Sequence, residues 1–179
     1  MKNQIYFKYN SKWGEMIGEV SETGALKGLW FVGQKYFPKA IPSEIAQVTD
    51  LSLLLSLKRI EDELNAYEQG ELDHFTIAIE PEGTDFQKEI WQILMQIPYG
   101  ETTTYGEISH KIAKRRNLLT MSSQAVGQAV GHNPISIIVP CHRVIGKNGS
   151  LTGYAGGMDR KTALLALEKK GCISNNVKE

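Results

Sequence analysis

The chain has 179 residues, of which 41% are hydrophobic and 22% are charged. This length and composition predict a protein that buries a core and folds as one compact unit or two small domains. The longest apolar stretch, residues 51–57, is too short to span a bilayer, and the first residues lead into no apolar signal core. We therefore expect a cytoplasmic protein that does not associate with a membrane.

The two cysteines and the distribution of charge along the chain bear on the kinds of site that it can contain. The only cysteines, Cys141 and Cys172, allow at most one disulfide or half of a four-cysteine zinc site, so free thiols fit best. Residues 1–83 carry 8 Lys and Arg against 13 Asp and Glu, whereas residues 84–179 carry 12 against 7. Either the basic half meets a polyanion or the asymmetry is chance, and charge alone does not decide.

The first 80 residues contain partly alternating apolar runs that are separated by turn formers. These runs cover residues 5–9, 13–20 and 26–33. They predict an antiparallel meander, and helical spacing over residues 51–64 predicts a covering helix. Residues 75–79 predict one more strand. We expect an α/β (α+β) protein whose first domain, residues 1–80, is an antiparallel sheet with this covering helix.

Short helices follow the turn-forming residues 80–83. They are predicted over residues 84–97, over residues 104–113 and from Ser122 or Ser123 onward. The last two resemble a helix-turn-helix, so we expect residues 84–174 to form a mostly helical domain of the winged-helix or helix-turn-helix type. A final helix is predicted to begin near Asp159 and to stop at Gly171.

One of these helices carries small residues at Ala125, Gly127, Ala129 and Gly131. Glycine is unfavourable inside a helix, so another group must approach closely. Helix packing is the commoner reason, and contact with a ligand as large as a nucleic-acid groove is the alternative.

A short apolar run, residues 135–139, predicts a strand that ends at Pro140 and delivers Cys141 at its exit. A buried filler is the usual role of such a cysteine, but the adjoining His142 and Arg143 favour a nucleophilic thiolate. Water or a turn would have to connect the imidazole with the thiol. Spacing does not choose the orienting carboxylate among the candidates Asp85, Glu89, Glu101, Glu107, Asp159 and Glu168.

The sequence Pro140-Cys141-His142-Arg143-Val144 resembles the active-site block of the O6-alkylguanine-DNA alkyltransferases, also called methylated-DNA–protein-cysteine methyltransferases. Residues 131–134 and 153–157 belong to the resemblance, which covers essentially residues 84–171. The first 80 residues are similar only in the order of their strands and helix, and this similarity implies a ribonuclease-H-like sheet there.

The resemblance implies direct-reversal DNA repair. An alkyl group passes from O6-alkylguanine in double-stranded DNA, with O4-alkylthymine as a further candidate, to Cys141, which reacts once. His142 is implied as the base that acts through water, and Glu168 as the carboxylate that orients it. Asn133 is implied to support the thiol, and Tyr105 to protonate the departing guanine.

The resemblance also implies how DNA is bound by a base-flipping helix-turn-helix whose second helix enters the minor groove. The residues implied to line the base pocket are Tyr105, Val144, Tyr154 and Ala155. The residues implied to contact DNA are Gln124, Ala125, Gly127, Val130 and Gly131. No metal and no cofactor is implied, and the protein is expected to be a monomer.

Two features depart from the family pattern. Gln124 stands where an arginine usually fills the vacated base position, and glutamine lacks its charge and flat stacking surface. We therefore expect slower base extrusion with intact chemistry. The segment between Tyr105 and Gln124 is longer than usual, and its Arg115 and Arg116 either contact phosphates or form a solvated loop.

Other functions would leave residues unused. A non-catalytic sensor of alkylation lesions would bind the same DNA without an acceptor thiol, which Cys141 argues against. A cysteine hydrolase or redox protein would have no use for the helix of small residues or for Tyr105.

Overall fold

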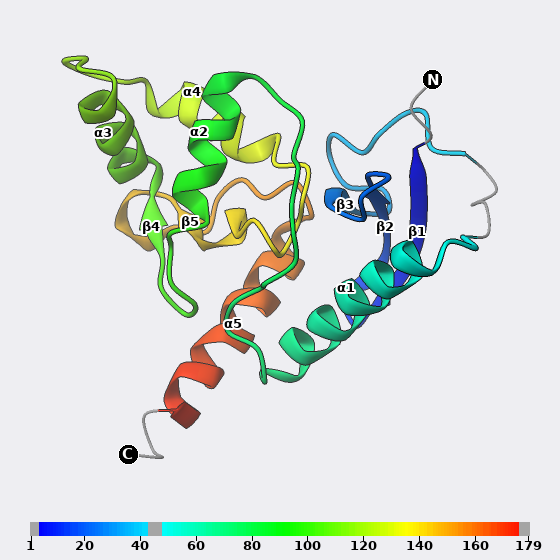
Figure 1. The fold of residues 1–179 in the computed structure, drawn as a ribbon. Coiled ribbons are helices and arrows are strands. Elements are labelled where there is room, and N and C mark those ends of the chain that lie inside the picture. Colours follow the sequence, from blue (N-terminus) through cyan, green and yellow to red (C-terminus); the bar gives the residue numbers. More distant parts are fainter. Residues whose placement is uncertain (1–3, 43–47, 176–179) are drawn as a thin grey trace. The chain divides into compact units, whose positions relative to one another are not determined.

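The computed structural model describes residues 4–42 and 48–175, with the backbone alone for residues 172–175. The chain divides into two compact units (Figure 1). The first contains the residues up to Glu82 together with Pro134–Ser136, and the second contains Gly83–Asn133 and the residues from Ile137 onward. The short inclusion of residues 134–136 in the first unit was not foreseen from sequence.

The first unit is a three-stranded antiparallel sheet in the order β1 (Ile5–Ser11), β2 (Gly14–Val20) and β3 (Leu26–Phe31). Helix α1 (Leu51–Gln69) lies along this sheet (Figure 1). The Asp50 side chain caps the helix, which ends at Gly70 in the left-handed conformation that glycine adopts readily. The predicted meander and its covering helix are therefore confirmed.

Helix α1 packs against the sheet through the side chains of one of its faces. Its buried side chains are Leu53, Ile60, Leu64 and Tyr67. The Tyr9 hydroxyl on β1 adds polar contacts to Asn65 at 3.0 Å and Glu68 at 2.9 Å. These positions are seven, four and three residues apart, so they lie on one face of the helix. Leu51, Leu54 and Leu55 are exposed, so the apolar pattern predicts the helix but only part of its packed face.

Two predicted strands are wrong. Residues 75–79 contribute only an isolated parallel bridge between Leu26 and Ile79. Residues 135–139 likewise contribute a single bridge, from Ile135 to Leu29, and then turn at Ile137, whose φ is +72°. An apolar, β-branched run indicates burial, but a strand also requires a neighbouring strand along its whole length. Each of these runs pairs with β3 at one residue only.

The second unit is mostly helical, as predicted. It contains α2 (Asp85–Leu94), α3 (Tyr105–Arg115), α4 (Ser123–Gly131) and α5 (Met158–Asn175). Two-residue strands β4 (Thr103–Thr104) and β5 (Val144–Ile145) pair in parallel. Both α2 and α3 begin with a capping box, formed by Thr84 with Gln87 and by Thr104 with Glu107, which explains why their starts were predictable.

Helix α5 does not stop at Gly171, contrary to the prediction. A Cβ atom at Gly171 would lie 2.9 Å from the Tyr99 ring, so the glycine permits a close approach inside the helix. None of the helices in the described part of the chain combines the length and apolar character needed to cross a membrane.

The helix-turn-helix pair α3 and α4 packs against α2. The Trp91 indole N–H on α2 donates a hydrogen bond of 2.9 Å to the Ala129 carbonyl on α4. Ala129 is buried, whereas Ala125, Gly127 and Gly131 are partly exposed. The small residues of α4 therefore serve packing on one side and leave a low surface on the other.

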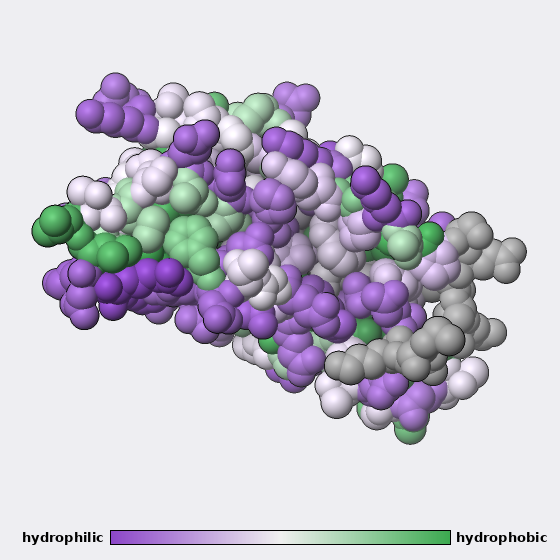
Figure 2. All heavy atoms as spheres, turned by 90° about the horizontal axis from the view of Figure 1, so that it is seen from above, coloured by the Kyte–Doolittle hydropathy of each residue, from purple (hydrophilic) through white to green (hydrophobic). Residues whose placement is uncertain are grey.

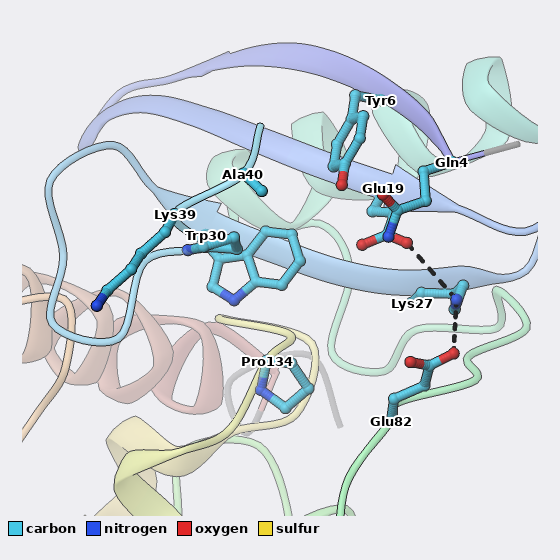
Figure 3. A pocket seen from close by; sticks show the side chains of 10 residues that line it. Gln4, Tyr6, Glu19, Lys27, Trp30, Lys39, Ala40, Glu82 and Pro134 are labelled. Carbon is cyan, nitrogen blue, oxygen red and sulfur yellow. Dashed lines mark ion pairs between the residues drawn. The ribbon is translucent and has the colours of Figure 1, made fainter. Parts of the chain in front are cut away.

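The first unit also has a pocket of about 330 Å³ beside its sheet (Figure 3). Trp30 and Tyr6 line it, and Lys27 forms ion pairs there with Glu19 at 3.5 Å and Glu82 at 2.6 Å. The hydrogen bond to Glu82 raises the pKa of Lys27. A single lysine in this pocket is thus shared between two carboxylates.

Candidate active site

The thiol of Cys141 is buried at the start of a single 3-10 turn, Cys141–Arg143, which follows Pro140. The Asn133 side-chain amide donates hydrogen bonds to the Val139 carbonyl at 2.8 Å and to Cys141 Sγ at 3.1 Å. Because the carbonyl fixes the amide, a donor is held facing the sulfur before any substrate arrives.

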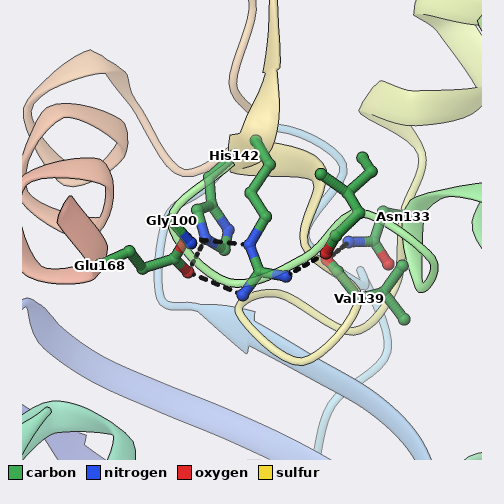
Figure 4. A network of polar contacts seen from close by, with 7 residues as sticks. Gly100, Asn133, Val139, His142 and Glu168 are labelled. Carbon is green, nitrogen blue, oxygen red and sulfur yellow. Dashed lines mark hydrogen bonds and ion pairs between the residues drawn. The ribbon is translucent and has the colours of Figure 1, made fainter. Parts of the chain in front are cut away.

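A fully buried carboxylate, Glu168 on α5, orients the neighbouring histidine (Figure 4). Its Oε1 lies 2.7 Å from His142 Nε2, and the Arg143 guanidinium donates to both carboxylate oxygens at 2.9 Å. The Gly100 backbone N–H donates to Oε2 at 3.1 Å. Arg143 also donates to the Ile97 carbonyl at 2.6 Å. The structure therefore brings together the histidine and the carboxylate that the resemblance implies.

These contacts set the protonation states. Burial on its own raises the pKa of Glu168, but hydrogen bonds and charge from His142 and Arg143 outweigh it and bring this pKa to about 2. Burial lowers the pKa of His142 despite Glu168, so the imidazole is neutral at neutral pH. Burial raises the pKa of the Cys141 thiol, although Asn133 and Lys161 oppose this rise. The resting site is thus a neutral thiol near a neutral base.

Lys161 is a further member of this site. It is fully buried on α5, and its ammonium group donates to the Val144 carbonyl at 2.6 Å and the Thr152 carbonyl at 2.7 Å. Burial lowers the pKa of Lys161 to about 8, although the Cys141 charge raises it. A cation therefore ties two backbone segments together close to the thiol.

Of the residues implied for the base pocket, Val144 contacts this cation through its carbonyl. Val144 is buried, and Tyr154 and Ala155 are partly exposed. The Tyr154 ring meets the His142 ring edge-on at 6.4 Å between centroids. The Tyr105 hydroxyl donates to the carbonyls of Thr152 at 3.3 Å and Gly153 at 3.2 Å. Burial, followed by the Cys141 charge, raises the pKa of Tyr105.

All the residues implied for DNA contact lie on α4, and all but one of them reach its surface. Gln124 is exposed, and Ala125, Gly127 and Gly131 are partly exposed. Val130 is only 2% exposed, so its side chain belongs to the core and the prediction that it contacts DNA is wrong for that side chain. A Cβ atom at Gly127 would lie 3.7 Å from the Tyr105 ring, which places the glycine beside the implied acid.

Sequence reasoning missed the roles of Arg143 and Lys161. The sequence predicts Arg143 only as a cation near the thiol, whereas its guanidinium holds the Glu168 carboxylate. Lys161, Leu164 and Glu168 are spaced by three and four residues, so they share the buried face of α5, and this spacing was the available signal. Within the described residues, no group of three or more His, Cys, Asp or Glu side chains could hold a metal ion. The Cys172 side chain lies outside the described residues.

Comparisons with known proteins identify the family. Residues 85–170 match the family described as 6-O-methylguanine DNA methyltransferase, DNA binding domain. A Mycobacterium bovis methylated-DNA–protein-cysteine methyltransferase is 56% identical over 108 residues, which are 60% of this chain and 62% of that protein. The match thus spans less than two thirds of that relative.

Two longer matches extend into the first unit. A Methanosarcina acetivorans protein of the same name is 46% identical over 152 residues, which are 85% of this chain and 92% of that protein. The crystal structure of Mycobacterium tuberculosis OGT in complex with DNA is similar at a TM-score of 0.76 and 41% identity, covering 93% of both chains. The chain therefore belongs to the methylated-DNA–protein-cysteine methyltransferase family.

Proposed function

We propose that this protein repairs DNA by direct reversal, acting as a cytoplasmic monomer on double-stranded DNA that carries O6-alkylguanine. Cys141 takes the alkyl group and keeps it, so that each molecule reacts once. The observation that carries this proposal is the contact between the Asn133 amide and the buried Cys141 thiol, next to a His142 imidazole held by Glu168. The names of the relatives support it.

The chemistry follows from the protonation states. A neutral His142 can accept the thiol proton through water, and the Asn133 donor stabilises the resulting thiolate. The sulfur then attacks the alkyl carbon, an S–C bond forms, and the C–O6 bond breaks with its electron pair moving to the guanine. Tyr105 supplies a proton to that guanine, so the proton lost by the thiol is balanced by one gained by the leaving group. The thioether product has no route back to a thiol.

Access to the lesion requires the base to leave the duplex, because the alkylated oxygen is enclosed by the stack. The partly exposed Ala125, Gly127 and Gly131 on α4 offer a low surface that suits close approach to a groove. The basic second half of the chain suits a polyanion.

Mass spectrometry of peptides tests this function after the protein is mixed with duplex DNA containing O6-methylguanine. We expect one added methyl group on the Cys141 peptide, one per protein molecule, and none with Cys141→Ser. Binding of the lesion without transfer would instead identify a non-catalytic lesion sensor. Equal binding to methylated and unmethylated duplexes would contradict both functions.

The residue at position 124 yields a further prediction. Gln124→Arg restores a charged, flat group on the exposed start of α4, so we expect methyl transfer from duplex DNA to accelerate about 2- to 10-fold. Single-turnover kinetics measures this rate. Gln128→Arg is the matched control, because Gln128 is also exposed on α4 and gains the same charge. Equal acceleration by both variants would show that charge alone, not a wedge at position 124, is responsible.

A further inference from the structure

The connection between α3 and α4, residues 116–122, is unusually long for a helix-turn-helix, whose helices are commonly joined by three or four residues. It begins with a defined structure. Asn117 adopts a left-handed φ of +54°. Its backbone N–H donates to the Lys114 carbonyl, and the Leu118 N–H donates to the Ala113 carbonyl. This pair of bonds is the Schellman motif that ends helices, so the start of the connection is held in one conformation.

Two leucines project from this fixed start. A Schellman motif commonly packs the residue after the left-handed one against the helix, but Leu118 is 48% exposed and Leu119 is 102% exposed. Figure 2 shows strongly hydrophobic surface at the end of the second unit that carries α3, directly beside hydrophilic side chains. We call Leu118 and Leu119 the tip leucines. Two adjacent exposed leucines on a defined turn are typical of a contact surface.

The sequence around the tip leucines is rich in positively charged residues, which favours a polyanion as the partner. Residues 108–158 contain six Lys and Arg and no Asp or Glu. Lys114 and Arg115 are exposed at the end of α3, and Arg115 has only a 3.5 Å contact to the Gln96 amide oxygen. Both cations are therefore available to phosphates.

Arg116, by contrast, is already engaged. Its Nε lies 2.8 Å from a Glu89 carboxylate oxygen, and its guanidinium lies over the Phe86 ring at 5.2 Å. The two adjacent arginines thus have different roles. Arg116 anchors the connection to α2, and Arg115 leaves its charge facing solvent.

We propose that the tip leucines form an apolar wedge that enters the groove of the duplex bound by α4, while Lys114 and Arg115 hold the flanking phosphates. This inference rests on the proposed function and adds a second point of contact with the DNA. Leucine wedges at base steps unstack and bend duplexes in proteins that bind the minor groove. A wedge beside the lesion compensates for the missing arginine at position 124 by loosening the stack from which the base must leave.

The first test compares the two solvent-facing cations, Lys114 and Arg115, with the engaged Arg116. The double variant Lys114→Gln and Arg115→Gln is expected to reduce the slope of log binding constant against log salt by about 2, because each lost phosphate contact reduces it by about 1. Arg116→Gln removes the same type of charge one residue later and is expected to leave the slope unchanged. Fluorescence anisotropy on a lesion-containing duplex measures both. An equal change for Arg116→Gln, or none for the double variant, would overturn the assignment of the cations.

The second test removes the wedge. Leu119→Ser is expected to weaken duplex binding about tenfold, as the loss of one buried leucine predicts, and to reduce the fluorescence of 2-aminopurine placed beside the lesion. Leu55→Ser, at an exposed leucine on α1, is the matched control and is expected to change neither. Methyl transfer from a short single-stranded oligonucleotide is expected to stay at the wild-type rate, because there is no duplex to unstack.

The outcomes separate this inference from the proposed function. If wild-type protein transfers methyl groups but Leu119→Ser binds and unstacks the duplex normally, the wedge is wrong and the repair function stands. If Leu119→Ser changes only the number of protein molecules per duplex in sedimentation, the tip leucines contact a second copy and the wedge is again wrong. If wild-type protein transfers no methyl group, the proposed function itself fails.

Discussion

Glu168→Gln is expected to lower the free energy of unfolding by about 3–5 kcal/mol and to slow methyl transfer at least tenfold. The glutamine has nearly the same shape, but it leaves the buried Arg143 guanidinium without a counter-charge and gives His142 a neutral partner. Breaking a buried ion pair from one side is strongly destabilising for this reason. Urea unfolding and single-turnover transfer measure the two effects.

The Glu168 carboxylate also makes the stability of the protein depend on pH in the acid range. Its folded-state pKa of about 2 lies below the ordinary value of 4.5, so its stabilisation is fully present above pH 4.5 and is lost as the pH falls towards 2. Wild-type stability should therefore fall more steeply than that of Glu168→Gln across this window. Glu101→Gln, at an exposed carboxylate of the same unit, is the control and should follow the wild type. Parallel curves for the wild type and Glu168→Gln would contradict the assigned role.

Asn133→Ala is expected to slow alkylation of Cys141 about 10- to 100-fold near neutral pH. The lost amide donates to the sulfur, and a hydrogen bond to a charged group contributes about 1.5–3 kcal/mol. Its removal raises the thiol pKa further above its ordinary value, since the Asn133 hydrogen bond lowers that pKa. The thiolate fraction at a given pH should fall accordingly.

The pH profile of the reaction with iodoacetamide tests this role, with Cys141 followed as its own peptide. The midpoint for Asn133→Ala should move to higher pH, while the rate at high pH approaches the wild-type plateau. Asn65→Ala, which removes an amide that contacts Tyr9 in the first unit, is the control. A lower plateau with an unchanged midpoint would show that Asn133 acts on the shape of the site and not on the thiol.

The parts of the fold that were predictable have local causes. Caps at Thr84, Thr104 and Ser122 mark the starts of three helices, because side-chain oxygens satisfy the free N–H groups of the first turn. The strands predicted at residues 75–79 and 135–139 failed because pairing depends on a partner far away in sequence. Local composition reports burial in both cases and says nothing about that partner.

In the active site, too, local features were predictable from the sequence and long-range contacts were not. Residue type and adjacency identify Cys141, His142 and Arg143 as reactive, but choosing Glu168 among six carboxylates depended on the family resemblance. The contact that decides it joins residues 26 positions apart, and the Gly100 N–H on the same carboxylate is 68 positions away. Such contacts follow from helix packing, which spacing alone does not specify.

The hydroxyl of Tyr105 has a single hydrogen, which it shares between the carbonyls of Thr152 and Gly153. In the proposed reaction it cannot serve these carbonyls and a departing guanine at once. Delivery of the proton therefore removes the Tyr105 hydrogen bonds to the segment that follows β5, while Lys161 still donates to the Thr152 carbonyl. Departure of the guanine and loosening of the segment that encloses it thus depend on the same proton transfer.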